Sequence, residues 1–245
     1  MQSVPPASRA RLERVLSGHG LRLRGGWMPG TEDGLPGLPA LPGGRSAAVV
    51  WMVGQVGSEC WRVFAASSFY ADGLPDPMDR WSKSIGKQLA QEFGGLAIYP
   101  SDGPPYYPFQ RWAQRAEPLR TSPLMLQIHP EFGLWHAYRF ALVLPVLLET
   151  DRGEIGQITQ HPAPDICLQC DGQPCLSACP VQAFTGAGYE VERCSNHLHG
   201  PDAYACKSTG CLARHACPVG AAQRYTPPHA AFHMAAFANR RVPPV

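Results

Sequence analysis

Eight of the nine cysteines lie between residues 167 and 217, and this concentration of thiols limits how that part of the chain can fold. Thiols gathered in this way are held by disulfides, by zinc or by iron–sulfur clusters. The first 20 residues lack the apolar core of a secretory signal, and the apolar stretch at 140–148 is too short to span a bilayer. We therefore expect a cytoplasmic protein without a membrane span, whose thiols stay reduced and bind metal.

The cysteines form two runs that end in the same four residues, Ala-Cys-Pro-Val. The first run has the spacing Cys-x2-Cys-x4-Cys-x3-Cys-Pro, and it differs from the bacterial ferredoxin run C-x2-C-x2-C-x3-C-P by two added residues. In that ferredoxin run the fourth cysteine ligates the other cluster. The shared ending therefore predicts two related halves that exchange their last ligands.

On this logic each of two [4Fe–4S] clusters has four thiolate ligands. The first cluster would take Cys167, Cys170, Cys175 and Cys217, and the second would take Cys179, Cys194, Cys206 and Cys211. The alternatives are one cluster with spare thiols, or zinc. Four-thiolate zinc sites also use C-x2-C pairs, although they have no use for the Cys-Pro endings. His197, His199 and His215 lie among these cysteines, and we expect them to be surface groups or to surround the ligands.

The remaining residues predict a mixed α+β domain, because helical and strand patterns alternate along the chain. Helices are expected at 7–17, 76–95 and 109–117, and strands at 46–54, 96–100, 124–128 and 137–149. The Pro/Gly-rich segment 26–44 is expected to be a loop, and the polar segment 149–165 to hold a domain boundary. The predicted domains are 1–160, 161–225 and a packing tail with a short helix at 226–245. Cys60 is expected to be a small buried apolar residue.

Two motifs resemble known families. The run CLQCDGQPCLSACP, with the later VERCSNHL and ACPVG, resembles the iron–sulfur part of epoxyqueuosine reductase, a family that binds two [4Fe–4S] clusters and a cobalamin. The stretch IHPEFGLWHAYRFALVLP at 128–145, with DPMDR at 76–80, resembles the CblC-type cobalamin-processing proteins. These resemblances imply a flavin-nitroreductase-like mixed-sheet domain, followed by a small ferredoxin-like domain with two clusters.

The second resemblance implies a cobalamin site in the loop between two predicted strands. A corrin needs aromatic faces and a few hydrogen-bond donors, and this loop contains both. The implied contacts are His129, Pro130, Phe132, Gly133, Trp135, Tyr138 and Arg139. Together the resemblances imply an oxidoreductase that reduces the cobalt of cobalamin with electrons from an external reductase or ferredoxin. No catalytic residue is assigned.

Two other functions fit the same residues. The protein could be a dicluster electron carrier of the ferredoxin type, with a first domain that only docks a partner. It could also be an FMN-dependent iron–sulfur oxidoreductase, in which Arg111 or Arg115 would bind the phosphate. The formal charge of +2 gives no reason to expect nucleic acid as a partner.

Overall fold

The computed structural model describes residues 8–30, 38–158, 163–185 and 188–239, so the end of the predicted tail, 240–245, lies outside it. The chain forms two compact units. Unit 1 comprises Met1–Gln55, Glu59–Pro118 and Ala137–Pro162, and unit 2 comprises Val56–Ser58, Leu119–His136 and Ala163–Val245. Each unit is therefore built from separate stretches of sequence. The domain bounds 1–160, 161–225 and 226–245 stay a prediction.

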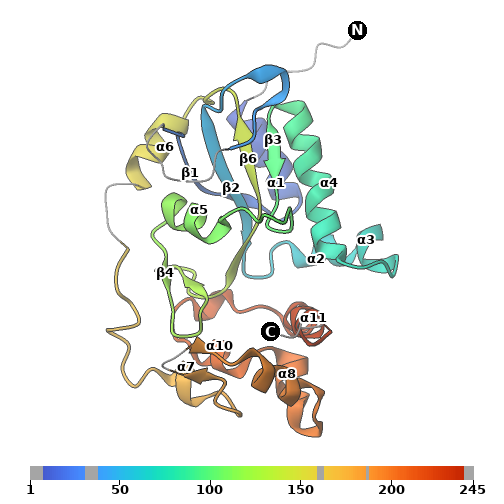
Figure 1. Cartoon of the computed structure of the whole chain (residues 1–245), viewed down its shortest axis with the longest axis vertical. Coiled ribbons are helices and arrows are strands. Elements are labelled where there is room, and N and C mark those ends of the chain that lie inside the picture. The colour runs from blue at the N-terminus through green and yellow to red at the C-terminus, as the bar shows by residue number, and fades with distance from the viewer. Residues whose placement is uncertain (1–7, 31–37, 159–162, 186–187, 240–245) are drawn as a thin grey trace. The chain divides into compact units, whose positions relative to one another are not determined.

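Unit 1 is organised around a four-stranded sheet with the order β1-β2-β6-β3 (Figure 1). The strands are β1 (Arg22–Trp27), β2 (Val49–Val56), β3 (Leu96–Ile98) and β6 (His136–Leu144). β1 pairs antiparallel with β2, and β3 pairs antiparallel with β6. Every residue of β2 is buried, as a nearly continuous apolar strand requires.

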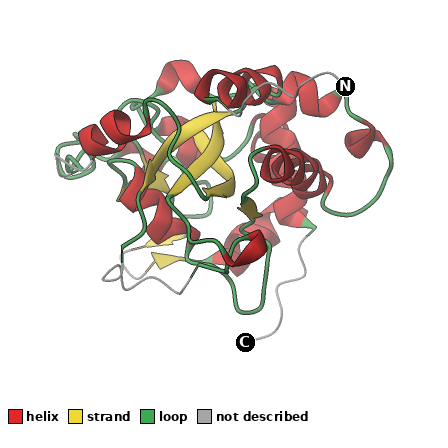
Figure 2. Ribbon diagram, turned by 90° about the horizontal axis from the view of Figure 1, so that it is seen from above, coloured by secondary structure: helices red, strands yellow, loops and turns green. Residues whose placement is uncertain are grey.

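Helices pack against both edge strands of this sheet, and Figure 2 shows them around the strands. α4 (Pro77–Glu92) packs on β3, while α1 (Arg9–Gly18), α5 (Phe109–Ala116) and α6 (Asp151–Ile158) pack on β1. Two short helices, α2 (Trp61–Ala65) and α3 (Ser68–Ala71), precede α4. The buried face of α4 contains Trp81, Ile85 and Leu89, which recur at helical spacing. Helices thus pack along both edge strands of the sheet.

The structure differs from the sequence-based expectations at four places in unit 1. β1 begins before the segment 26–44, which was expected to be a loop, and extends into it. α2 and α3 lie in a stretch for which no element was predicted. β6 ends at Leu144 because Pro145 cannot continue the ladder, so the predicted strand 137–149 is too long. α6 occupies part of the predicted polar linker, because Asp151 is buried and accepts a hydrogen bond from Arg9.

Unit 2 consists of short helices and two small hairpins. The hairpins are β4 (Arg120–Thr121) with β5 (Gln127–Ile128), and β7 (Phe184–Thr185) with β8 (Gly188–Tyr189). The helices are α7 (Pro174–Ser177), α8 (Val191–His199), α9 (Tyr204–Thr209), α10 (Leu212–Ala216) and α11 (Pro227–Ala238). Only the last two residues of the predicted strand 124–128 are extended, and α11 confirms the helix expected in the tail. No helix in the described ranges combines the length and the apolar character needed to cross a membrane.

The core of unit 2 joins the stretch at 119–136 to the cysteine-bearing stretch. Leu124, Ile128 and Leu134 pack in one buried cluster with Cys179 and Cys217. Several other cysteines pack against this cluster from its edge, namely Cys167, Cys175, Cys194 and Cys211. The residues that resemble a cobalamin loop therefore supply part of the hydrophobic core beneath the thiols.

Candidate functional site: two sets of cysteines and the loop beneath them

Four cysteines line one apolar cavity in unit 2, and we call them the first set. They are Cys167, Cys170, Cys175 and Cys217. Leu124, Ile128, Leu134 and Val219 are among the apolar residues that line the same cavity. Cys167 and Cys170 precede α7, Cys175 lies within it, and Cys217 directly follows α10. Residues from both ends of the cysteine-bearing stretch therefore meet at one place.

The thiols of the first set lie close enough to affect one another. Burial, together with the thiolates of Cys217, Cys175 and Cys170, raises the pKa of Cys167 to about 11. Burial and the neighbouring thiolates of Cys217 and Cys170 likewise raise the pKa of Cys175. The pKa of Cys217 is raised by burial and by Cys170. A nearby like charge disfavours ionisation, so these directions agree with four thiols that line one cavity.

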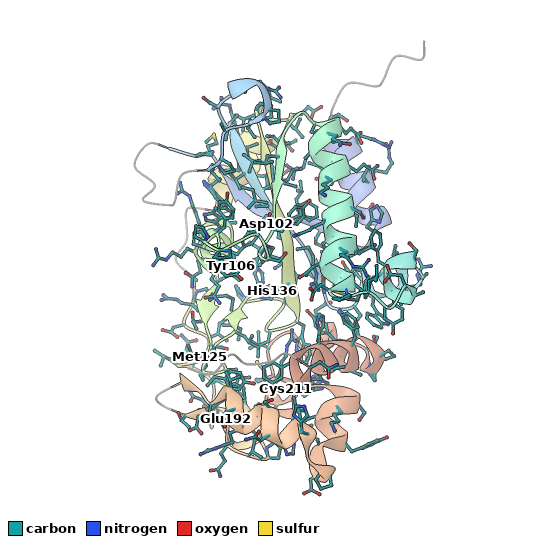
Figure 3. The ribbon with its side chains drawn as sticks, turned by 45° about the vertical axis from the view of Figure 1, so that its right-hand side comes forward. Asp102, Tyr106, Met125, His136, Glu192 and Cys211 are labelled. Carbon is teal, nitrogen blue, oxygen red and sulfur yellow. The ribbon has the colours of Figure 1, made fainter. Side chains whose placement is uncertain are left out.

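The second set consists of Cys179, Cys194, Cys206 and Cys211. Burial raises the pKa of Cys194, a hydrogen bond from Tyr189 opposes that rise, and the thiolates of Cys179 and Cys206 add to it. Burial and Cys179 raise the pKa of Cys206, while burial, Cys194 and Cys206 raise that of Cys211. Cys211 directly precedes α10, and Figure 3 labels it among the helices of unit 2. Each of these thiolate effects thus joins members of the same set.

The structure gathers the first set around one cavity, and the role of all eight cysteines as ligands stays a prediction. Among the residues that the structure describes, no three His, Cys, Asp or Glu side chains are placed to hold a metal ion. That finding applies to side chains that converge on a single ion, as the ligands of a tetrahedral zinc site do. A cubane cluster distributes four thiolates around the corners of a cube, and it therefore holds them further apart.

A tight turn at 129–133 lies beneath the first set. The backbone N–H and C=O groups of His129 pair with those of Gly133, both at 2.9 Å. The Nδ1 atom of His129 accepts hydrogen bonds from the backbone N–H groups of Glu131 and Phe132, at 3.1 and 3.2 Å. Its ring also stacks on Phe132, with centroids 4.3 Å apart. Because Nδ1 accepts, the ring is neutral with its proton on Nε2, and it stabilises the turn.

Two glycines allow this turn to meet the segment after Cys217. Gly133 has φ +57°, and a Cβ atom there would lie 2.0 Å from the carbonyl oxygen of Val219. Gly220 has φ +67°, and its Cβ atom would lie 2.3 Å from the carbonyl group of Phe132. Only glycine combines this backbone conformation with so close an approach. The turn therefore fixes the position of the Cys-Pro-Val-Gly ending.

Trp135 is covered by residues of α10 and the segment after it. The guanidinium of Arg214 lies 4.5 Å from the ring centroids of both Trp135 and Tyr225, and its Nε donates to the carbonyl of Leu134 at 3.1 Å. The rings of His215 and Trp135 meet edge to face, with centroids 4.9 Å apart. Arg214 and His215 lie between two cysteines of different sets, so α10 connects both sets to the loop.

The other predicted cobalamin contacts, Tyr138 and Arg139, belong to unit 1. The Tyr138 hydroxyl donates to the carboxylate of Glu117, which also accepts two bonds from Arg24 at 2.9 and 3.1 Å. Arg139 donates from Nε to the side-chain oxygen of Gln55 at 2.7 Å. Burial raises the pKa of Glu117 and, more strongly, that of Tyr138. Unit 1 thus contains a buried polar network.

Sequence reasoning missed three members of this network, Arg24, Gln55 and Glu117. One signal was available, because Gln55 is a polar residue inside the apolar run VVWMVGQV. Such a residue is buried only when its hydrogen bonds are satisfied, so it indicates polar partners nearby. Arg24 could not be found this way, because its partner Glu117 lies 93 positions later.

Two further predictions concern single side chains of unit 1. Cys60 is fully buried, as expected, and burial raises the pKa of its thiol. Arg111 is exposed on α5, and the guanidinium of Arg115 lies 5.5 Å over the Trp27 ring. Neither arrangement distinguishes a phosphate site from an ordinary helix surface, so FMN binding stays a prediction.

The antiparallel strand pairs and the surrounding helices define an α+β protein. Among solved structures, the chain is similar to the crystal structure of a B12-trafficking protein, CblC, from C. elegans, described as a homologue of human MMACHC. The TM-score is 0.52 with 14% sequence identity, over 95% of this chain and 92% of that chain. At this identity the likeness shows a shared fold. No protein-family model matches the chain, and no curated protein matches it in sequence.

Proposed function

We propose that the protein is an iron–sulfur oxidoreductase that binds cobalamin and reduces its cobalt with electrons from an external reductase or ferredoxin. One observation carries the iron–sulfur part of this proposal. Thiols from both ends of the cysteine-bearing stretch line a single apolar cavity, with Cys217 beside Cys167, Cys170 and Cys175. In a dicluster ferredoxin, ligands exchanged between two runs meet in this way.

The surroundings of the thiols fit a cluster. The lining of the first set is mainly apolar, and a backbone N–H group lies at one sulfur of each set. Ala183 donates to Cys179 Sγ at 3.3 Å, and the backbone near Cys217 donates to that sulfur from Val219. Such donors stabilise thiolates and set the reduction potential. Two [4Fe–4S] clusters bound there would supply one-electron transfer.

Cobalamin is supported by the fold and by two buried donors. The similar CblC structure is that of a B12-trafficking protein. In unit 1, the Nε2 atom of Gln55 and the Nη2 atom of Arg139 are buried without a hydrogen-bond partner among the described residues. Unpaired buried donors are costly, and the amide carbonyls of a corrin are acceptors that would satisfy them. Bound cobalamin would supply the redox-active cobalt.

The loop residues fit a corrin less well. Trp135 is 1% exposed, with its ring covered by Arg214, His215 and Tyr225. His129 uses Nδ1 within its own turn. Pro130 and Phe132 are only half-buried. We therefore place the cobalamin contacts at Tyr138 and Arg139 together with Gln55, while the roles of His129, Pro130, Phe132, Gly133 and Trp135 in binding stay predictions.

Anaerobic purification with iron, sulfide and corrinoid analysis tests both parts. We expect the iron and acid-labile sulfide of two [4Fe–4S] clusters, and a spectral shift when hydroxocobalamin is titrated into the cluster-containing chain. Gln55→Leu should lower the affinity for hydroxocobalamin by about tenfold, because one good hydrogen bond is lost. Arg111→Met, on an exposed helix face, should leave it unchanged.

The two parts can fail separately. A colourless preparation that contains zinc in place of iron and sulfide would refute the iron–sulfur assignment. Full iron content without any hydroxocobalamin shift would instead leave a dicluster electron carrier, and flavin absorption bands would point to the FMN-dependent enzyme.

A further inference from the structure

α11 carries two histidines four positions apart in the sequence HAAFH, and these lie on one face of the helix. The Nε2 atoms of His229 and His233 face each other at 3.1 Å. Their ring centroids are 4.9 Å apart, at an angle of 43°. Both residues lie in unit 2, outside the two sets of cysteines.

The separation of these nitrogens suits a shared metal ion. Zinc binds imidazole nitrogen at about 2.0–2.1 Å with tetrahedral angles, which places two such nitrogens about 3.3–3.4 Å apart. The observed 3.1 Å lies within about 0.3 Å of that spacing, so only a small adjustment of the His233 side chain is required.

The ring of His229 is held in the orientation that a ligand requires. Its Nδ1 atom lies 2.9 Å from Ser58 Oγ, and that oxygen accepts a hydrogen bond from the backbone N–H of Thr226 at 2.8 Å. Tyr225 stacks on the same ring, with centroids 4.1 Å apart and planes at 19°. Histidine ligands almost always have their second nitrogen fixed by such a partner, which directs the other nitrogen to the metal.

The two histidines also differ in exposure. His229 is fully buried, whereas His233 is half-buried, so an ion can be captured from solvent at His233 and held against the fixed ring. We propose that His229 and His233 form a binding site for one divalent first-row transition metal such as Zn²⁺, with water at its remaining positions. Imidazole suits zinc, copper, iron and nickel.

Equilibrium dialysis of the cluster-containing full chain against Zn²⁺, under anaerobic conditions, tests this site. Zinc and iron are counted together by mass spectrometry, so that exchange at the cysteines is detected as lost iron. We expect the wild-type chain to hold one zinc more than His233→Ala and His233→Gln. The matched control is His199→Ala, an exposed histidine on α8 that bonds within its own helix, and it should keep the zinc.

Equal zinc in the wild type and in folded His233→Gln would show that the two rings only share a hydrogen bond, and it would overturn the proposal. An equal loss of zinc in His199→Ala would overturn it as well, by showing unspecific histidine binding. Circular dichroism identifies a variant that fails to fold, and His233→Gln, which keeps a hydrogen-bonding side chain, then decides the result. The zinc difference does not depend on the iron content, so this inference stands apart from the proposed function.

Discussion

Replacing Gly133 with alanine should destabilise unit 2 through a backbone collision. The added Cβ atom would lie 2.0 Å from the carbonyl oxygen of Val219, a separation that real structures do not contain. Val219 cannot retreat without moving Gly220, which itself approaches Phe132 with no space for a side chain. The collision therefore involves two backbone segments, at Gly133 and at Val219, and neither can move without displacing the other.

The magnitude follows from two contributions. Alanine in the left-handed region costs about 1–2 kcal/mol. Forcing extra atoms into a packed region costs about 1–3 kcal/mol more. A central value for both together is about 3 kcal/mol, which lowers the melting temperature of a chain of this size by about 6–12 °C.

Gly172→Ala provides a matched control. Gly172 also has a positive φ, +65°, and belongs to unit 2, but nothing lies within 4 Å of the place a Cβ atom would take. It should incur only the conformational cost, about 1 kcal/mol and about 2–4 °C. Thermal unfolding followed by circular dichroism, at one scan rate for the wild type and both variants, measures the difference. Equal melting temperatures for the two variants would refute the reasoning.

The remaining predictions concern the cysteines and the buried network of unit 1. Cys167→Ser and Cys217→Ser should each remove the same cluster and leave the same electron paramagnetic resonance signal, whereas Cys206→Ser should leave the other; different signals from the first two would contradict the grouping. Arg24→Met leaves Glu117 buried without its cation, so it should lower the free energy of unfolding by about 3–5 kcal/mol. Urea denaturation measures this change, and a loss below about 1 kcal/mol would contradict it.

The parts of the fold with a local signal could be predicted from the sequence. α4 begins with a proline at its first position and ends before two glycines, and β2 is a continuous apolar run. β1 has no such signal, because the sequence RLRGGW contains two glycines and two arginines. Arg24 is buried there because it pairs with Glu117, a partner that only the folded chain supplies.

The candidate site also has a part with a local sequence signal and a part without one. The repeated Ala-Cys-Pro-Val ending predicts which cysteines belong to each group. Cys217 lines one cavity with Cys167, Cys170 and Cys175, and the ligand groups themselves stay a prediction. The contribution of 129–135 to unit 2 could not be predicted. It depends on the mutual approach of Gly133 and Gly220, and glycine alone does not reveal what its backbone will touch.

Unit 2 is built from three separate stretches of sequence, and this limits which fragments of the protein can be made. A fragment that starts at residue 163 would omit Leu119–His136, and with it Leu124, Ile128 and Leu134 from the core under the thiols. It would also omit Ser58, the partner of His229. The cysteine-bearing part therefore does not contain a complete core by itself, and a chimera that is to keep this core must contain all three stretches of unit 2.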